Sequence, residues 1–246
     1  MSRDGSTNHG EWTGLFRSMS PMARNTFSIG LQHGSDVPLV EPSYAQFTDS
    51  TLSTYKNWTF FYRTRVDGSA RNSTIFRHAP IYRMSNVTYE DVWAKSSIGF
   101  DLPLDQWAYQ YAHSKFCLVI RGDTPHSSAL LRSLRVGCIP VVASDYFERY
   151  SPTLKSSLKS FADFVIFVNE QDFVNDPGRE LRKILQEYNK TILLEKIAGA
   201  RFAQRIAFPD HPQSLFVPAF LKEAWLSLHP VERPTTTLLK PRLPHT

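Results

Sequence analysis

The pattern of apolar and polar positions along the chain predicts short buried strands that alternate with amphipathic helices. The clearest unit contains a strand, a tight loop, a helix and a second strand, at residues 116–120, 121–126, 127–136 and 139–143. In this helix Leu130, Leu131 and Leu134 share one face, and Gly137 stands where a C-cap glycine would end it. The unit therefore has the order and length of a right-handed parallel β-α-β crossover.

The same pattern predicts further strands and helices on both sides of this unit. Strands are expected at 58–62, 87–93 and 164–168, and helices at 69–78, 105–114, 177–188, 192–207 and 213–228. The strand at 164–168 is apolar on both faces, so we expect it in the interior of the sheet. Because strands and helices alternate, the expected fold class is α/β with a doubly wound parallel sheet.

Composition divides the chain into three parts. Residues 1–36 are rich in Ser, Gly, Asn and Arg and have weak periodicity, so they are interpreted as a flexible lead or the remnant of an amino-terminal domain. Residues 37–229 hold the alternating strands and helices. Residues 230–246 are rich in Pro and Thr without an apolar period, which predicts a disordered tail.

Charge and hydropathy limit the classes of partner. The net charge of +5 is spread over 246 residues without a block of like charges, which agrees with an anionic ligand. No helix-turn-helix, zinc-finger or RNA-binding signature accompanies it, so nucleic acid is not an expected partner. The sequence shows no run near the ~18 apolar residues of a membrane span and no signal-peptide core at its start.

The two cysteines begin the two strands of the central unit. If those strands are neighbours, Cys117 and Cys138 could lie close enough to form a disulfide. Free cysteines would instead pack as small apolar side chains, and we expect this second arrangement. Two cysteines so far apart in the sequence do not form a metal site, and no metal is expected.

The loop after the strand at 116–120 has the chemistry of an anion site. Arg121 supplies a permanent fork of donors, and Gly122 allows a close approach to the backbone. Either Thr124 or Asp123 suits the N-cap of the following helix, whose free N–H groups and positive dipole end lie at the carboxyl end of a strand. A capped loop without a ligand is the alternative, because the loop matches neither the dinucleotide glycine fingerprint nor a Walker loop.

Two runs of the chain closely resemble the core of the exostosin-like glycosyltransferases. They are Ser-Lys-Phe-Cys-Leu-Val-Ile-Arg-Gly-Asp-Thr-Pro-His-Ser-Ser at 114–128 and Val-Gly-Cys-Ile-Pro-Val-Val-Ala-Ser-Asp at 136–145. The resemblance continues less clearly from about residue 38 to about residue 229. It implies the carboxy-terminal, Rossmann-like half of a two-domain GT-B enzyme. Such an enzyme transfers a sugar, with inversion, from a nucleotide-sugar donor, usually a UDP-sugar, to a glycan acceptor.

The resemblance also implies which residues hold the donor. Those of the loop and the helix start are Arg121, Gly122, Asp123, Thr124, Ser127 and Ser128. Arg63 and Arg71 are the candidates for a basic residue that approaches the diphosphate after the first strand, with exposed arginines as the alternative reading. No DxD motif of acidic residues requires a metal.

Two positions depart from the family pattern. Family members commonly carry an arginine and, three residues later, an acidic residue on the helix after the loop, where this chain has Ala129 and Arg132. A carboxylate there would bind the ribose hydroxyls, and Arg132 cannot accept those hydrogen bonds. Arg132 could instead meet a phosphate or an acidic sugar. The departure motivates an alternative function, a catalytically impaired partner or glycan-binding subunit.

The catalytic base is not identified by the sequence. The candidates are the loop carboxylates Asp145 and Glu148 and the first-turn residue His126, which could instead donate to a phosphate or simply be exposed. His113, at the end of the helix predicted over 105–114, is interpreted as structural.

The resemblance places the protein in the Golgi lumen, anchored by a membrane helix that this chain would lack as an incomplete fragment. Four Asn-X-Thr patterns, at Asn57, Asn72, Asn86 and Asn189, would suit a lumenal glycoprotein. Besides the nucleotide sugar and the glycan acceptor, another glycosyltransferase is an expected partner.

Overall fold

A computed structural model of the chain describes residues 37–65, 92–97, 104–120, 129–145, 147, 157–158 and 160–228. The lead predicted over 1–36, the helix predicted over 69–78 and the tail predicted over 230–246 lie outside the described residues.

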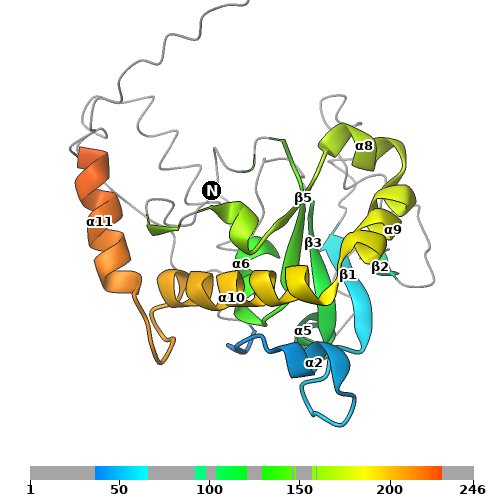
Figure 1. Ribbon diagram of the computed structural model, residues 1–246, viewed down its shortest axis with the longest axis horizontal. Helices are drawn as coiled ribbons and strands as arrows, with labels where there is room; N and C mark the ends of the chain where they lie inside the picture. The colour runs from blue at the N-terminus through cyan, green and yellow to red at the C-terminus, as the bar shows by residue number, and fades with distance from the viewer. Residues whose placement is uncertain are drawn as a thin grey trace, which may run out of the picture.

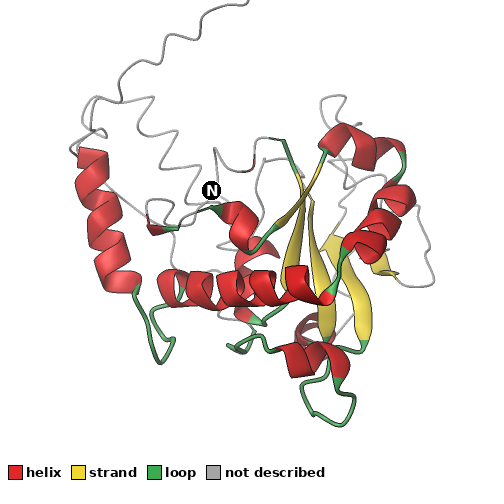
Figure 2. Ribbon diagram, viewed as in Figure 1, coloured by secondary structure: helices red, strands yellow, loops and turns green. Residues whose placement is uncertain are grey.

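Five strands among the described residues form one parallel sheet in the order β2-β1-β3-β4-β5 (Figure 1). They are β1 at Trp58–Arg65, β2 at Val92–Ser97, β3 at Ser114–Ile120, β4 at Ile139–Ala143 and β5 at Ile166–Val168. The chain moves from β1 out to β2, returns to the other side of β1 as β3, and continues to β4 and β5. This topology and the helices around the sheet (Figure 2) confirm the predicted doubly wound α/β fold.

The helices mostly begin and end within three residues of the predicted bounds. They are α2 at Tyr44–Thr48, α5 at Leu104–Ala112, α6 at Ala129–Arg135, α8 at Glu170–Asn175, α9 at Pro177–Glu187, α10 at Lys190–Ala207 and α11 at Phe216–Leu228, with a 3-10 turn, η3, at Phe161–Asp163. Side-chain caps define several starts. Asp176 accepts a hydrogen bond from Arg179 N ahead of Pro177, and Asn189 accepts one from Ile192 N.

The central unit folds as its pattern predicts. Gly137 has a φ of 66°, and the N–H groups of Gly137 and Cys138 donate to the carbonyls of Leu134 and Ser133 at 3.2 and 2.9 Å. These two bonds form a Schellman motif, which ends α6 and turns the chain into β4. A Cβ at Gly137 would lie 2.8 Å from the carbonyl oxygen of Val40, so the close approach of residues 40–42 also requires glycine.

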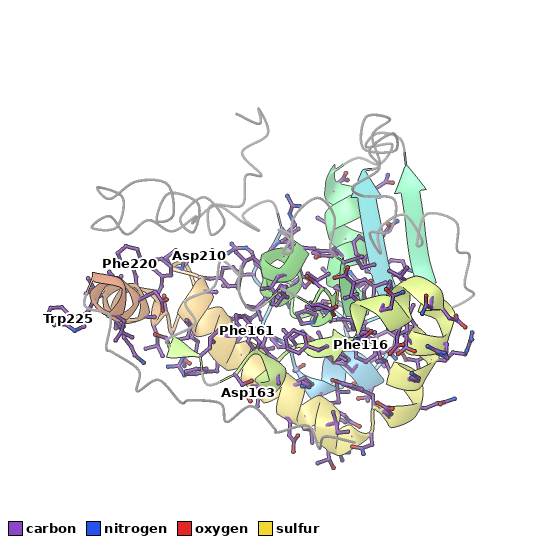
Figure 3. The ribbon with its side chains drawn as sticks, turned by 90° about the horizontal axis from the view of Figure 1, so that it is seen from above. Phe116, Phe161, Asp163, Asp210, Phe220 and Trp225 are labelled. Atoms are coloured by element: carbon purple, nitrogen blue, oxygen red, sulfur yellow. A yellow bond between two sulfur atoms is a disulfide. The ribbon has the colours of Figure 1, made fainter. Side chains whose placement is uncertain are left out.

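The core lies around β3 and β4, which are buried along almost their whole length. Leu130 and Leu134 of α6 are fully buried against them, and each contributes roughly 1.5–3 kcal/mol of hydrophobic stabilisation. In Figure 3 Phe116 of β3 lies among the packed side chains, whereas Trp225 projects from the outer side of α11. The exposed fraction of Trp225 is 63%.

Two strand predictions need correction. The strand expected over 87–93 is β2 at Val92–Ser97, later in the chain. The strand expected in the interior over 164–168 is shorter, and among the described strands it pairs only with β4, at the edge of the sheet. Phe167 is 41% exposed there. An apolar pattern on both faces did not reveal the edge position, because burial depends on neighbours from elsewhere in the chain.

The expectation of free thiols is wrong, because Cys117 and Cys138 form a disulfide with Cα atoms 5.9 Å apart. Cys117 pairs in register with Pro140, two residues after Cys138. Side chains two apart on a strand share a face, so the two sulfur atoms point to the same side of the sheet. The disulfide joins β3 to the residue that directly precedes β4.

The entry segment, residues 37–43, is joined by hydrogen bonds to α6 and to α10, which come much later in the sequence. Val40 N donates to the carbonyl of Arg135 at 2.8 Å. Gln204 Nε2 of α10 donates to the carbonyl of Val40 at 2.8 Å, and Arg201 Nε donates to that of Pro42 at 2.7 Å. The entry segment is thus held between α6 and α10.

Candidate functional site

The carboxyl edge of the sheet is where a ligand would bind. Open parallel sheets bind ligands beyond the carboxyl ends of their strands, at the point where the strand order reverses. Here the reversal lies between β1 and β3, which end at Arg65 and Ile120. The neighbouring strand β4 ends in register with β3, since Ile120 pairs with Ala143.

Most of the predicted site residues lie outside the described residues. These are Arg71, Arg121, Gly122, Asp123, Thr124, His126, Ser127, Ser128 and Glu148. Seven of them fall between Ile120, the last residue of β3, and Ala129, the first residue of α6. The roles assigned to these residues stay predictions.

Arg63 belongs to β1, and only its backbone is described. It pairs in register with Lys95 of β2, two positions before the end of β1. Its Cα therefore lies near the carboxyl edge, on the strand that flanks the reversal point.

The start of α6 is held by a buried group of hydroxyls. The carbonyl of Ala129 accepts hydrogen bonds from the Tyr111 hydroxyl at 2.7 Å and from the Ser133 hydroxyl at 2.5 Å. Arg132, half-buried, lies one turn into the same helix. Ala129 and Arg132, the two positions that depart from the pattern of the resembled family, therefore both lie on α6.

Asp145 and Glu170 meet beyond the ends of β4 and β5. Asp145 N donates to Glu170 Oε2, and Glu170 N donates to Asp145 Oδ1, both at 3.2 Å. Asp145 is exposed, so its carboxylate is both oriented and accessible. Asp145 was a candidate from the sequence, and Glu170 was not. Its position could have indicated it, because Glu170 follows the end of β5 by two residues, as Asp145 follows the end of β4.

His113 lies at the opposite, amino edge of the sheet. Its Nδ1 is 2.8 Å from the carbonyl oxygen of Tyr109, and its Nε2 is 3.0 Å from that of Ser53. The ring also stacks on Tyr109, with centroids 4.0 Å apart. These contacts support the structural interpretation of His113.

Lys56 also lies at the amino edge of the sheet, and the sequence pattern gave no indication of its role. The fully buried Nζ donates to the carbonyls of Ala112 and Val136, at 2.5 and 2.9 Å. Burial lowers the pKa of Lys56 to about 7. Because Ala112 is the last residue of α5 and Val136 directly follows α6, Lys56 fastens the ends of two helices together.

In the described part of the chain, no three His, Cys, Asp or Glu side chains gather as metal ligands. Likewise, no helix there has the length and hydropathy needed to cross a bilayer.

The fold is that of an α/β protein with a parallel sheet whose strand order reverses between β1 and β3. Residues 18–187 match the family model for the Exostosin GT47 domain, and this interval is more than half of the chain. The chain therefore belongs to the exostosin GT47 family, which implies a glycosyltransferase. A search of curated proteins found no match. The family match ends at the last residue of α9, so α10 and α11 lie beyond it.

Proposed function

We propose that this chain is the carboxy-terminal, donor-binding part of an inverting glycosyltransferase that takes a sugar from a nucleotide sugar, such as a UDP-sugar, and transfers it to a glycan acceptor. The observation that carries the proposal is the reversal of strand order between β1 and β3 in a chain of the exostosin GT47 family. The loop predicted to bind an anion follows β3 directly.

The donor's diphosphate is proposed to bind at residues 121–128. Arg121, the backbone N–H groups that follow it, and the hydroxyls of Thr124, Ser127 and Ser128 would contact the phosphate oxygens. Arg63 and Arg71 would approach from β1 and the residues after it. Donors aimed at the leaving diphosphate offset the negative charge that develops as the glycosidic bond breaks.

Inversion requires a single displacement, in which a base takes the proton of the acceptor hydroxyl while that oxygen attacks the anomeric carbon. Among the three candidates, Asp145 has support from the described contacts, because Glu170 N holds one of its carboxylate oxygens at an exposed position. Glu148 and His126 remain candidates from the sequence alone. Arg132 is proposed to meet a phosphate or an acidic sugar group.

The disulfide supports an oxidising compartment, because such bonds persist in secreted and lumenal proteins. Together with the family, this favours the Golgi lumen as the location. A glycan acceptor and a second glycosyltransferase are the proposed macromolecular partners, and a membrane anchor would lie outside this chain.

The proposal is tested by calorimetry with UDP and several UDP-sugars. Replacing Arg121 with alanine should weaken UDP binding about 10- to 100-fold, because a charge-assisted hydrogen bond is worth about 1.5–3 kcal/mol. Arg182→Ala is the matched control, since Arg182 is an exposed arginine of α9. A folded wild-type chain that binds no UDP would contradict the proposal.

The second candidate is a non-catalytic partner or glycan-binding subunit. Ala129 and Arg132, in the places of the common arginine and acidic residue, favour it. Transfer assays on the full-length protein separate the two functions. An enzyme transfers sugar and loses turnover on Arg121→Ala, whereas a subunit of this second kind binds glycan without transfer.

A further inference from the structure

We propose that Asn57 carries an N-linked glycan whose first sugar packs against the ring of Tyr55. Asn57 begins the run Asn-Trp-Thr at 57–59, which has the residue types that N-glycosylation requires. The inference goes beyond the proposed function and rests on one part of it, the lumenal location, because such glycans are attached in the lumen of the secretory pathway.

Asn57 lies at the surface, at the edge of the sheet opposite the candidate ligand site. It is exposed and directly precedes Trp58, the first residue of β1. Trp58 N donates to the carbonyl of His113 at 3.1 Å, ahead of β3, so both residues belong to the amino edge. A glycan on Asn57 therefore extends into solvent without entering the core, and it leaves the carboxyl edge open.

The residues on either side of Lys56 point outward. Lys56 is fully buried, and its Nζ donates to carbonyls of the interior, whereas Tyr55 is half-buried and Asn57 is exposed. This alternation is typical of extended backbone, in which side chains two positions apart lie on the same side. The ring of Tyr55 and the amide of Asn57 therefore share one side of the chain.

The ring of Tyr55 offers a surface on which a sugar can pack. Tyr55 N donates to the carbonyl of Leu52 at 3.0 Å, and Lys115 Nζ lies 5.9 Å from the ring centroid, so the residue is held on two sides. The face of an aromatic ring is negative and attracts the partly positive C–H groups of a pyranose. A sugar joined to Asn57 is tethered within reach of this ring.

The other Asn-X-Thr patterns lack this partner. Two positions before their asparagines stand an alanine, a methionine and a glutamate, in place of the tyrosine before Asn57. Of these three patterns, the structure describes the one at Asn189, whose Oδ1 already accepts a hydrogen bond from Ile192 N at 3.1 Å and caps α10. The sequence alone gave the four patterns equal standing, and the surroundings of Asn57 distinguish it.

The modification transfers an oligosaccharide from a lipid-linked pyrophosphate. The nitrogen Nδ2 of Asn57 attacks C1 of the first N-acetylglucosamine, and an Nδ2–C1 bond forms. The bond between C1 and the pyrophosphate oxygen breaks, and its electron pair leaves with the lipid pyrophosphate. Nδ2 gives one proton to a base of the attaching enzyme, so the product is a neutral glycosylated amide.

The first test maps glycans on the full-length protein purified from a eukaryotic host. We expect the peptide that holds residue 57 to carry a glycan, and Asn57→Gln to remove one glycan from the protein. Asn175→Gln, at an exposed asparagine outside any such pattern, is the matched control and should remove none.

An unmodified residue 57 in protein that is glycosylated elsewhere overturns the proposal. Protein without a glycan at any of the four patterns overturns it as well, and shows that the lumenal location was wrong. Neither result bears on donor binding, which calorimetry with UDP measures separately.

The second test asks whether the sugar packs on the ring, by following amide exchange in the peptide over residues 49–61. The glycan should slow exchange there about two- to tenfold relative to Asn57→Gln, which corresponds to the strength of a contact between two aromatic rings. In Tyr55→Leu protein, Asn57→Gln should have no such effect, whereas Tyr55→Phe keeps the ring and should keep it.

The same variants are also made in cells in which synthesis of the lipid-linked donor is blocked. Without a glycan, Asn57→Gln should leave exchange unchanged in every background, which separates the sugar from the asparagine itself. A glycan that slows exchange equally in wild-type and Tyr55→Leu protein would show that it does not pack on Tyr55.

Discussion

At the scale of single residues, buried polar side chains fasten the backbone at the ends of helices. Lys56 donates to the carbonyls of the last residue of α5 and of the residue after α6, and Gln204 donates to carbonyls of α6 and of the entry segment. Tyr111 does the same at the start of α6. Each of these carbonyls would otherwise be costly to bury, so removing a donor should destabilise the fold.

The stability contributed by Lys56 should depend on pH. The pKa of Lys56 is about 7 in the folded protein, against an ordinary value of 10.5. Between these values the unfolded state binds a proton that the folded state does not, so stability rises with pH across the window. Lys56→Met removes this slope, which is up to about 1.4 kcal/mol per pH unit. It also deletes two hydrogen bonds, at a cost of about 1–3 kcal/mol.

Urea unfolding of wild type and Lys56→Met at about pH 7 and at about pH 9 checks this expectation. The gap between the two proteins should widen at the higher pH. Comparing the two proteins cancels the contribution of other titrating groups. Parallel stability curves would show that Lys56 has the same pKa in both states.

At the scale of elements, α10 and η3 approach each other at a glycine. A Cβ at Gly199 would lie 2.3 Å from the carbonyl oxygen of Asp163, a backbone atom that cannot turn aside. In an open helix alanine would be favoured over glycine by about 1 kcal/mol. Here the clash opposes that gain, because α10 or η3 must move.

Gly199→Ala should therefore lower the free energy of unfolding by about 1–3 kcal/mol, as overpacked substitutions do. Chemical denaturation measures it. Glu195→Ala, at an exposed position of α10, is the control and should stay within about 0.5 kcal/mol of wild type. A more stable Gly199→Ala protein would mean that the two elements are further apart than described.

The disulfide closes a covalent loop that runs from β3 through α6 to the residue before β4. Its cysteines are 21 residues apart in the sequence, a loop length for which a disulfide typically contributes about 2–4 kcal/mol. Replacing both Cys117 and Cys138 with alanine should lower the free energy of unfolding by that amount. Peptide mapping of wild-type protein without reductant should recover the linked pair. Two freely alkylated thiols under those conditions would refute the bond.

At the scale of the whole molecule, local pattern predicted much of the fold. The β3-α6-β4 unit, with its glycine cap, follows from apolar periodicity and from backbone conformation, both of which are local properties. The position of β5 at the edge does not, because neighbouring strands decide which face of Phe167 is covered. The disulfide depended on register, which the sequence left open.

Local pattern also predicted part of the candidate site. The sequence indicated which strand leads into the loop that we propose binds an anion, since residue types and spacing there are local. Glu170 and Tyr111 could not be found in this way. Both make contacts between separate elements: Glu170, at the start of α8, meets Asp145 after β4, and Tyr111 of α5 meets Ala129 of α6.

The tie between the entry segment and α10 has a consequence for synthesis. Val40 and Pro42 receive hydrogen bonds from residues 164 and 159 positions later in the chain. A ribosome delivers those partners only after all the strands have been made, so until translation passes Gln204 the segment has its hydrogen bonds to Arg135 but not those to α10. Nascent chains stalled before that point should leave residues 37–43 open to protease, and chains stalled beyond it should protect them.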